Sequence, residues 1–277
     1  MTVQVTLLGT GSPLPAAQQA GPATLVRAGQ ALLLVDCGRG VVMRLAACGV
    51  LPVGLSAVLL THLHSDHITD LNDVMTTHWI MTSGPTPLRV IGPPGTQRLV
   101  DAVLAMLALD QGYRQAHHAD LSYPISVDVI EVEPGTVLDV AGTSIMVKPT
   151  DHRPVEPTVG YRIEHDGASV AIGGDGVPCA GLDELCAGAD IYVQTVMRAD
   201  LIGRVASLRL REILTYHSTI EQAAQTAERA GVRIFLPTHF LPAIAPGDED
   251  AWRALAAAHF DGQIVLGGDL TAVSADR

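Results

Sequence analysis

The chain has 277 residues and a formal net charge of −12, and 48% of its residues are hydrophobic. This composition is typical of a globular protein with a substantial core, and it excludes a disordered chain. The basic residues are sixteen arginines and the single lysine Lys148, without a basic stripe. That pattern argues against a large nucleic acid as ligand, although bound dications and local arginines can reverse the charge near a site.

The first fifteen residues contain neither a basic n-region nor an apolar h-region, and no apolar run approaches the roughly 20 residues of a membrane helix. The cysteines show no C-x-x-C pair and no disulfide-scaffold density. They are Cys37, Cys48, Cys179 and Cys186. We therefore expect a soluble, cytoplasmic protein with reduced thiols and no membrane partner.

Strands and helices are expected to alternate in the first part of the chain, because short apolar runs alternate with helical periodicity and turn residues. The predicted strands are Val3–Leu8, Thr24–Arg27, Leu32–Val35, Ala57–Leu60 and Leu88–Ile91. The predicted helices are Gly40–Cys48, His67–Met81 and Thr96–Leu109.

A second group of strands follows, which implies a second sheet region. The predicted strands are Ser126–Val132, Thr143–Lys148, Thr158–Glu164, Ala168–Ile172, Ile191–Gln194, Arg233–Leu236 and Gln263–Val265, and the predicted helices are Thr219–Ala230 and Asp248–Ala258. No linker, charge run or internal repeat interrupts the pattern. We expect one α/β domain over residues 1–277, with two sheets and helices outside.

Four potential metal ligands occur within six residues, in the segment His62-Leu63-His64-Ser65-Asp66-His67. The segment directly follows a predicted apolar strand. Residues two apart on extended backbone point the same way, so His62 and His64 can reach one ion. Asp66 and His67, where the chain turns into a helix, can reach a second ion. Surface histidines in a loop are the alternative interpretation, which this density of ligands disfavours.

Three further candidate ligands each follow a predicted apolar strand: His152, Asp175 and His239. Strand ends collect ligands because the sheet fixes the backbone while the loop lets the side chain turn inward. Taken singly, His152 could be a loop residue, Asp175 a turn residue and His239 a capping residue. Their combination with the first segment favours a metal site.

The order of these candidate ligands resembles the motif pattern of a known family. A His-x-His-x-Asp-His segment, followed by His, Asp and His at successive strand ends, is similar to the ordered ligand pattern of the metallo-β-lactamase fold. Three further segments resemble its ribonuclease Z and arylsulfatase-like branch: Leu8-Gly9-Thr10-Gly11-Ser12-Pro13, Asp36-Cys37-Gly38 and Tyr216-His217-Ser218-Thr219. The resemblance implies a four-layer αββα sandwich with a dinuclear site between the sheets at one edge.

The resemblance also implies roles for the candidate residues. By motif position, one zinc ion is expected at His62, His64 and His152, and the other at Asp66, His67 and His239, with Asp175 bridging. Manganese or iron could replace zinc. Asp66 and His217 are expected to be catalytic, His217 as the proton donor to the leaving group. Its alternative is a neighbour of a helix cap, and Asp36 could orient a ligand histidine or simply occupy a turn.

The resemblance predicts hydrolysis by a hydroxide nucleophile, since two adjacent ions lower the pKa of a shared water and stabilise an in-line displacement. A phosphodiester, in a nucleotide or RNA end, is the predicted substrate, and a sulfate ester, carboxylic ester or lactone is the alternative. The Gly- and Pro-rich arm that tRNA-processing relatives carry between the residues matching His152 and Asp175 is missing. Its absence argues against tRNA as substrate.

Other functions remain as alternatives. A non-catalytic scaffold of the same fold would be expected to lose ligands, and this chain keeps seven of them together with His217. Iron-based redox chemistry is disfavoured by the full bridging set and by the absence of a fused redox domain. Arg153, next to His152, could bind a substrate anion or be structural. A homodimer is possible.

Overall fold

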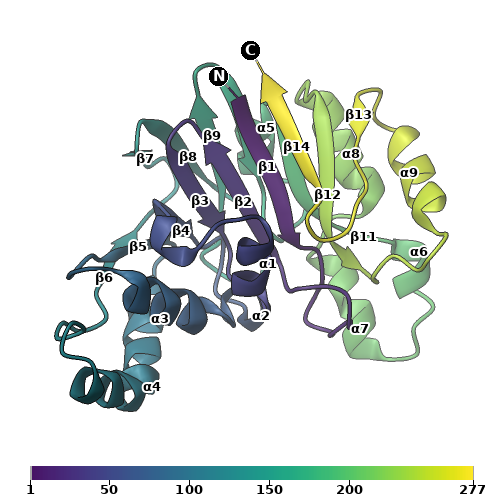
Figure 1. The fold of residues 1–277 in the computed structure, drawn as a ribbon. Helices are drawn as coiled ribbons and strands as arrows, with labels where there is room; N and C mark the ends of the chain where they lie inside the picture. Colours follow the sequence, from purple (N-terminus) through teal and green to yellow (C-terminus); the bar gives the residue numbers. More distant parts are fainter. Residues whose placement is uncertain (1, 277) are drawn as a thin grey trace.

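The computed structural model describes residues 2–276, whose strands form two seven-stranded sheets (Figure 1). The first sheet has the order β14-β1-β2-β3-β4-β5-β6. Its strands are β1 (Thr2–Gly9), β2 (Ala23–Ala28), β3 (Ala31–Val35), β4 (Ala57–Leu59), β5 (Leu88–Gly92), β6 (Val127–Glu131) and β14 (Ala272–Asp276). Antiparallel pairing joins β14, β1, β2 and β3, and parallel pairing joins β3 through β6.

The second sheet has the order β13-β12-β11-β10-β9-β8-β7. Its strands are β7 (Val137–Val140), β8 (Thr143–Pro149), β9 (Val159–His165), β10 (Ala168–Ile172), β11 (Ile191–Met197), β12 (Ile234–Leu241) and β13 (Gln263–Ile264). Antiparallel pairing joins β7 through β10, and parallel pairing joins β10 through β13. Both sheets are therefore mixed. The prediction of two sheet regions is confirmed, but the strand predicted at Ser126–Val132 belongs to the first sheet, as β6, and not to the second group.

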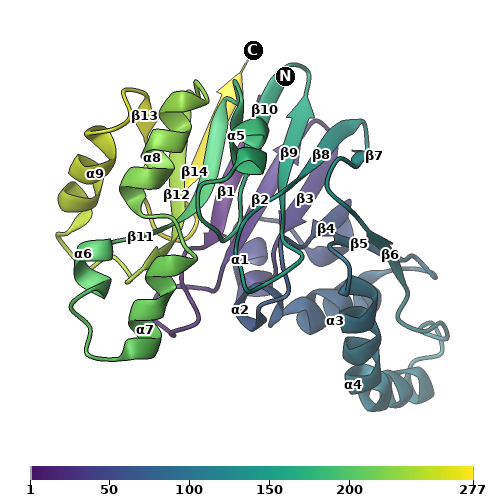
Figure 2. The same cartoon turned by 180° about the vertical axis from the view of Figure 1, so that it is seen from behind.

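Helices cover the outer face of each sheet (Figures 1 and 2). The first sheet is covered by α1 (Val41–Ala47), α3 (Leu71–Met81) and α4 (Thr96–His117), and the second by α5 (Ala180–Cys186), α8 (Ile220–Arg229) and α9 (Glu249–Ala257). This arrangement is the four-layer αββα sandwich, and the predicted fold class is confirmed. Within residues 2–276, no helix combines the length and apolarity needed to cross a membrane.

Three apolar cores hold the four layers together. The core between the sheets takes alternate residues of facing strands, such as Val5 and Leu33 on one side and Val147 and Val170 on the other. Strand residues of the opposite parity pack against the helices. This alternation is the period of two that lets one strand contribute to two cores. Hydrogen bonds also join the two sheets, and one of them runs from the buried Tyr161 hydroxyl to the Leu60 carbonyl at 2.6 Å.

The predicted helix over His67–Met81 is wrong in its boundaries, because the chain forms α2 (Ser65–Ile68) and α3 with a break at Thr69 and Asp70. Tertiary hydrogen bonds explain the break. The Cys37 amide donates to the His67 carbonyl at 2.6 Å, the Asp70 amide donates to the Cys37 carbonyl at 3.0 Å, and the Asp70 carboxylate accepts from the Gly40 amide. The break therefore ties this segment to the turn that contains Asp36.

Other boundaries also differ from the prediction. The helix that was expected to end at Leu109 continues to His117, where an Arg114–Asp110 ion pair supports its last turns. The sequence analysis missed several short elements: β7, β14, α5, α6 (Ala199–Ile202), α7 (Leu208–Glu212) and the 3-10 helices η1 (Pro52–Gly54) and η2 (Ile213–Thr215). All of them have seven residues or fewer, too few to show a reliable period.

Candidate metal centre

The His-x-His-x-Asp-His segment begins just after β4 and ends inside α2. His62 lies in extended chain beyond the strand, and His64 is the N-cap residue of α2 with φ −64° and ψ 147°. Asp66 and His67 lie in the single turn of α2 and are buried. The change from extended to helical backbone sends the first two imidazoles in one direction and the last two side chains in another.

The other three candidates come from the second sheet. His152 lies beyond the end of β8, and Asp175 follows β10. His239 lies inside β12 rather than after it, which corrects the expected strand end at Leu236. The pairing of β11 with β12 shifts register here, and His239 has a positive φ of 46°. This bulge turns the imidazole out of the regular strand alternation and toward the centre.

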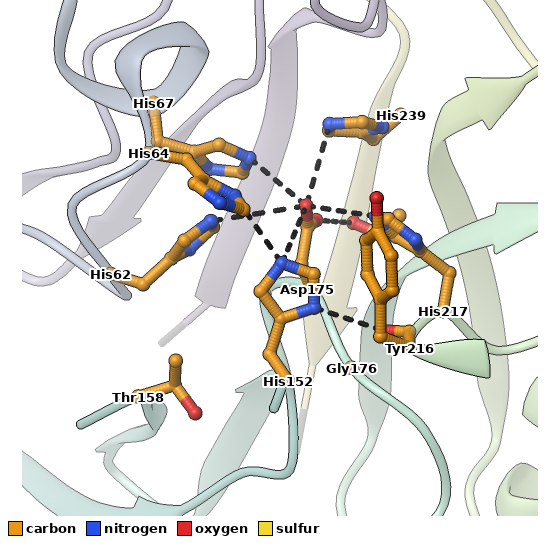
Figure 3. A network of polar contacts seen from close by, with 12 residues as sticks. His62, His64, His67, His152, Thr158, Asp175, Gly176, Tyr216, His217 and His239 are labelled. Carbon is orange, nitrogen blue, oxygen red and sulfur yellow. Dashed lines mark hydrogen bonds and ion pairs between the residues drawn. The ribbon is translucent and has the colours of Figure 1, made fainter. Parts of the chain in front are cut away.

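The structure brings all seven candidates together in two groups. The first group is His62, His64, His152 and Asp175, and the second is Asp66, His67 and His239. Within each group, one potential ligand atom per residue lies within 4.8 Å of the others. Figure 3 shows the imidazoles of the two groups turned toward the carboxylate of Asp175.

The Asp175 carboxylate lies at the middle of the cluster. Its Oδ2 is 3.4 Å from His67 Nε2, 3.6 Å from His239 Nε2 and 3.9 Å from the Nε2 atoms of both His62 and His152. Two nitrogen or oxygen ligands of one tetrahedral zinc ion, each about 2.1 Å from the metal, are roughly 3.4 Å apart. The spacing therefore suits coordination of ions between these atoms.

Polar contacts at the Nδ1 atoms of three imidazoles hold their Nε2 atoms toward the cluster. His67 Nδ1 donates to Asp36 Oδ2 at 2.8 Å, and His152 Nδ1 donates to the Tyr216 carbonyl at 2.8 Å. His62 Nδ1 is 3.0 Å from the Thr61 hydroxyl, which itself donates to Asp36. With the proton on each Nδ1, each Nε2 would present a lone pair to the cluster.

Buried ring nitrogens without a hydrogen-bond partner support a metal site. Among the described residues, His62 Nε2, His67 Nε2 and His239 Nδ1 are buried and unpaired. An unsatisfied buried polar atom costs about 1–3 kcal/mol, so native proteins rarely retain one without a partner. The donor set of imidazoles and carboxylates suits zinc and similar divalent ions. The residues present therefore fit a pair of divalent cations.

The electrostatics of the cluster are those of an anionic centre surrounded by histidines. Although burial raises it, the pKa of Asp175 is held well below its usual range by His239 and His67. Burial lowers the pKa of His62 well below its usual range, which keeps this imidazole neutral and able to coordinate. Although burial lowers them, the pKa values of His67 and His239 are raised by Asp175, so metal binding at these two imidazoles would release protons.

Glycines let the Asp175 loop approach the first sheet closely. Gly174 has a positive φ of 66°, and a Cβ there would lie 2.9 Å from the Thr61 side chain. The Cβ of any residue at Gly176 would lie 2.7 Å from the Asp151 carbonyl oxygen. The Gly-Asp-Gly sequence is therefore required for Asp175 to reach across between the sheets.

Asp36 takes the orienting position, rather than the simple turn role that the sequence analysis gave as its alternative. Besides His67, it accepts hydrogen bonds from the Thr61 amide at 2.8 Å and the Thr61 hydroxyl at 2.9 Å. It is buried and has a positive φ of 63°, an unfavourable conformation for a residue with a side chain. Strained backbone of this kind concentrates at functional sites.

His217 lies beside the cluster, just before α8. Its Nε2 is 3.3 Å from Asp175 Oδ2, and its Nδ1 is 3.3 Å from the Ile213 carbonyl. The sequence analysis assigned no role to two neighbours: Thr195, whose hydroxyl donates to Asp175 Oδ1 at 2.6 Å, and Tyr216, whose ring lies 4.6 Å from that of His217. Tyr216 immediately precedes His217, which was the available signal.

Arg153 does not face the cluster. Its guanidinium forms a two-point ion pair with Asp151, and 69% of its side chain is exposed. The structure therefore favours the structural interpretation of this arginine over anion binding.

Comparison with known proteins shows the family of this chain. Residues 32–240 match the β-lactamase superfamily domain. A relative from Mycolicibacterium paratuberculosis called Ribonuclease Z is 58% identical over 276 residues, which are 99% of this chain and 99% of that protein. The chain belongs to the ribonuclease Z family of the β-lactamase superfamily.

Solved structures show the same fold. The metallo-β-lactamase fold protein YhfI from Bacillus subtilis has a TM-score of 0.77 at 23% identity and covers 99% of each chain. The short form of human tRNase Z has a TM-score of 0.70 at 21% identity and covers 98% of each chain. The match with the mycobacterial ribonuclease Z extends over nearly all of both chains, so that relative has no long additional arm. The absence of the arm is therefore not a difference between this chain and that relative.

Proposed function

We propose that this protein is a metal-dependent phosphodiesterase that hydrolyses a phosphodiester at an RNA end. The observation that carries the proposal is the cluster of five imidazoles and two carboxylates in two adjacent groups, in which every residue but the half-buried His64 is buried. The resemblance to a Ribonuclease Z over 99% of both chains supports RNA as the substrate class.

Two zinc ions are the proposed cofactors. His62, His64 and His152 would hold one, Asp66, His67 and His239 the other, and Asp175 would contact both. Bound as a pair, such ions supply Lewis acidity that lowers the pKa of water and offsets the charge of a phosphoryl transition state. Thr195 and Asp36 keep Asp175 and His67 aimed at the centre through their hydrogen bonds.

Asp66 and His217 are the proposed catalytic residues. Both line the pocket that opens onto the cluster. Asp66 Oδ2, which is 3.1 Å from His239 Nε2, orients the attacking water by accepting a hydrogen bond. His217 donates a proton from Nε2 to the leaving-group oxygen, while its Nδ1 stays directed at the Ile213 carbonyl.

Further features of the protein are part of the same proposal. The whole chain, residues 1–277, would act as one domain around this centre, in the cytoplasm, with a homodimer as its assembly. The net charge of −12 favours a short RNA end over a long duplex, because few phosphates can be neutralised away from the ions.

Hydrolysis of bis(p-nitrophenyl) phosphate by zinc-loaded protein tests the proposal, with p-nitrophenyl sulfate and acetate run alongside. The His64→Ala variant removes one ligand. The His259→Ala variant is the matched control, because His259 is exposed and lies outside both ligand groups. We expect phosphodiester turnover that His64→Ala abolishes and His259→Ala retains.

Turnover confined to the sulfate or acetate would overturn the phosphodiester assignment in favour of the sulfatase or esterase prediction. Absence of turnover on every ester, from protein whose ion content is full, would favour the non-catalytic scaffold.

A further inference from the structure

A pocket of about 450 Å³ opens beside the metal-ligand cluster. Its floor contains side chains of the centre: His64, Asp66, Asp175, His217 and His239. Cavities that hold a small organic ligand have volumes of roughly 300–1,000 Å³. The pocket therefore has the size for one nucleotide-sized group next to the reacting phosphate, and not for a nucleic acid helix.

The walls of this pocket are mainly aliphatic. They come from three separate segments: the loop after β1, the region from α6 to η2, and the end of β12 (Figure 1). The aliphatic side chains are Leu14, Ile202, Val205, Leu210, Ile213 and Leu241. Such walls stabilise the burial of an organic group and do nothing for a phosphate anion. The pocket is thus suited to the organic part of a phosphodiester.

Tyr216 adds an aromatic surface to the pocket. It is half-buried, and its ring lies 5.2 Å from the His152 ring and 4.6 Å from the His217 ring (Figure 3). Its backbone carbonyl accepts from His152 Nδ1, so the residue is fixed relative to the centre. Aromatic side chains held in this way are platforms on which a nucleobase stacks.

Arg209 supplies the only permanent positive charge among the described residues that line the pocket. It lies in α7, is exposed, and forms no ion pair with any residue that the structure describes. Arg153 and Arg198 differ, because Arg153 is paired with Asp151 and Arg198 with Asp200. A guanidinium with unused donors is matched in geometry to a phosphate.

We propose that this pocket binds the nucleoside attached to the scissile phosphate, and that Arg209 binds the next phosphate along the chain. The inference rests on the proposed phosphodiesterase function and adds a substrate subsite to it. The segment from α6 to η2 thereby acts as the specificity element, with aliphatic residues toward the base and sugar and Arg209 toward the phosphate. A substrate with a nucleoside and a second phosphate would be preferred over a simple diester.

Three chromogenic diesters that release the same p-nitrophenolate test this inference: methyl p-nitrophenyl phosphate, the p-nitrophenyl ester of thymidine 5′-phosphate, and that thymidine ester with a 3′-phosphate. For the zinc-loaded protein, we expect KM to fall from the first to the second. The 3′-phosphate should lower KM by about a further tenfold, the factor that one charge-assisted hydrogen bond supplies.

Matched variants assign each preference to its side chain. Arg209→Gln should remove the gain from the 3′-phosphate, whereas Arg211→Gln, on the same helix but outside the pocket lining, should keep it. Leu210→Ser should reduce the preference for thymidine over methyl, whereas Leu214→Ser should not, since Leu214 is not a lining residue. Unchanged melting temperatures would show that all four variants fold.

The outcomes separate this inference from the proposed function. Failure of the wild-type protein to cleave any of the three diesters would overturn the phosphodiesterase proposal itself. Cleavage of all three with equal KM would leave that proposal standing and refute the nucleoside subsite. A gain from the 3′-phosphate that survives in Arg209→Gln, or disappears equally in Arg211→Gln, would refute the role of Arg209.

Discussion

Asp36 allows a sharp test of how the centre is held, because the Asp36→Asn substitution keeps the shape of the side chain and removes its charge. The asparagine carbonyl can still accept from the Thr61 amide, now 2.8 Å from Asp36 Oδ1. Its amide group would then face His67 Nδ1, where Asp36 Oδ2 accepts at 2.8 Å. The imidazole can satisfy that amide only by moving its own proton to Nε2.

The proton at Nε2 blocks the atom that His67 would use to coordinate a metal. Restoring the binding tautomer costs about one charge-assisted hydrogen bond, roughly 1.5–3 kcal/mol. At about 1.4 kcal/mol for each factor of ten, metal affinity should fall by about 10- to 150-fold. This range agrees with the roughly 10- to 100-fold losses found when partners of ligand histidines are removed.

Zinc affinity measured by competition with a chromogenic chelator is the appropriate assay, with turnover followed against free zinc. The control is Asp190→Asn, which alters a buried carboxylate at the amino end of β11, away from the centre. Both variants should lose stability, but only Asp36→Asn should lose zinc affinity and recover turnover at high zinc. Equal zinc affinity in Asp36→Asn and wild type would refute the orienting role.

Three further predictions concern catalysis and stability. His217→Ala should lower kcat by about 10²- to 10⁴-fold, which is the usual contribution of a general acid, and should leave the metal content at the wild-type value. Loss of metal in this variant would instead identify His217 as a ligand. Removal of metal by a chelator should lower Tm by roughly 5–10 °C relative to the Tm of protein in zinc at 100 times the Kd, because zinc binding at that concentration contributes about 2.7 kcal/mol to stability. An unchanged Tm in calorimetry would contradict a metal site in the native state. Tyr161→Phe should lower the free energy of unfolding in urea by about 1–2 kcal/mol, because it removes the hydrogen bond to Leu60, and turnover should be retained. An unchanged unfolding midpoint would show that this hydrogen bond makes no net contribution to stability.

The seven candidate ligands could be picked out from the sequence because their signals are local. Four ligand-type residues in six positions after an apolar strand are visible without any tertiary information. The spacing of His62 and His64 follows from the period of two, which any extended segment has. The strand ends before His152 and Asp175 are marked by apolar runs that stop at Thr150 and Gly173.

Features that depend on distant contacts could not be predicted. The bend of β12 at His239 arises from its register with β11, some forty residues earlier in the chain. The break between α2 and α3 depends on hydrogen bonds to the turn around Cys37. Neither contact produces a local period in the sequence, so neither could be predicted from it.

The pocket beside the cluster could not be predicted from the sequence either. Its walls use α6 and α7, which have four and five residues and are too short for a helical period. Arg209 is one of sixteen scattered arginines, and only its place beside the centre distinguishes it. Substrate contacts of this kind follow from the fold and not from a motif.

Counting the metal ions bound per folded chain tests the central claim, two adjacent ion sites that share Asp175, most directly. Native mass spectrometry of zinc-loaded protein should find two ions in the wild-type chain and one in each of His64→Ala and His239→Ala, because each variant lacks a ligand of one group. Turnover of bis(p-nitrophenyl) phosphate should be lost in both variants. A wild-type chain that hydrolyses the diester with one ion or none would contradict the two-ion centre.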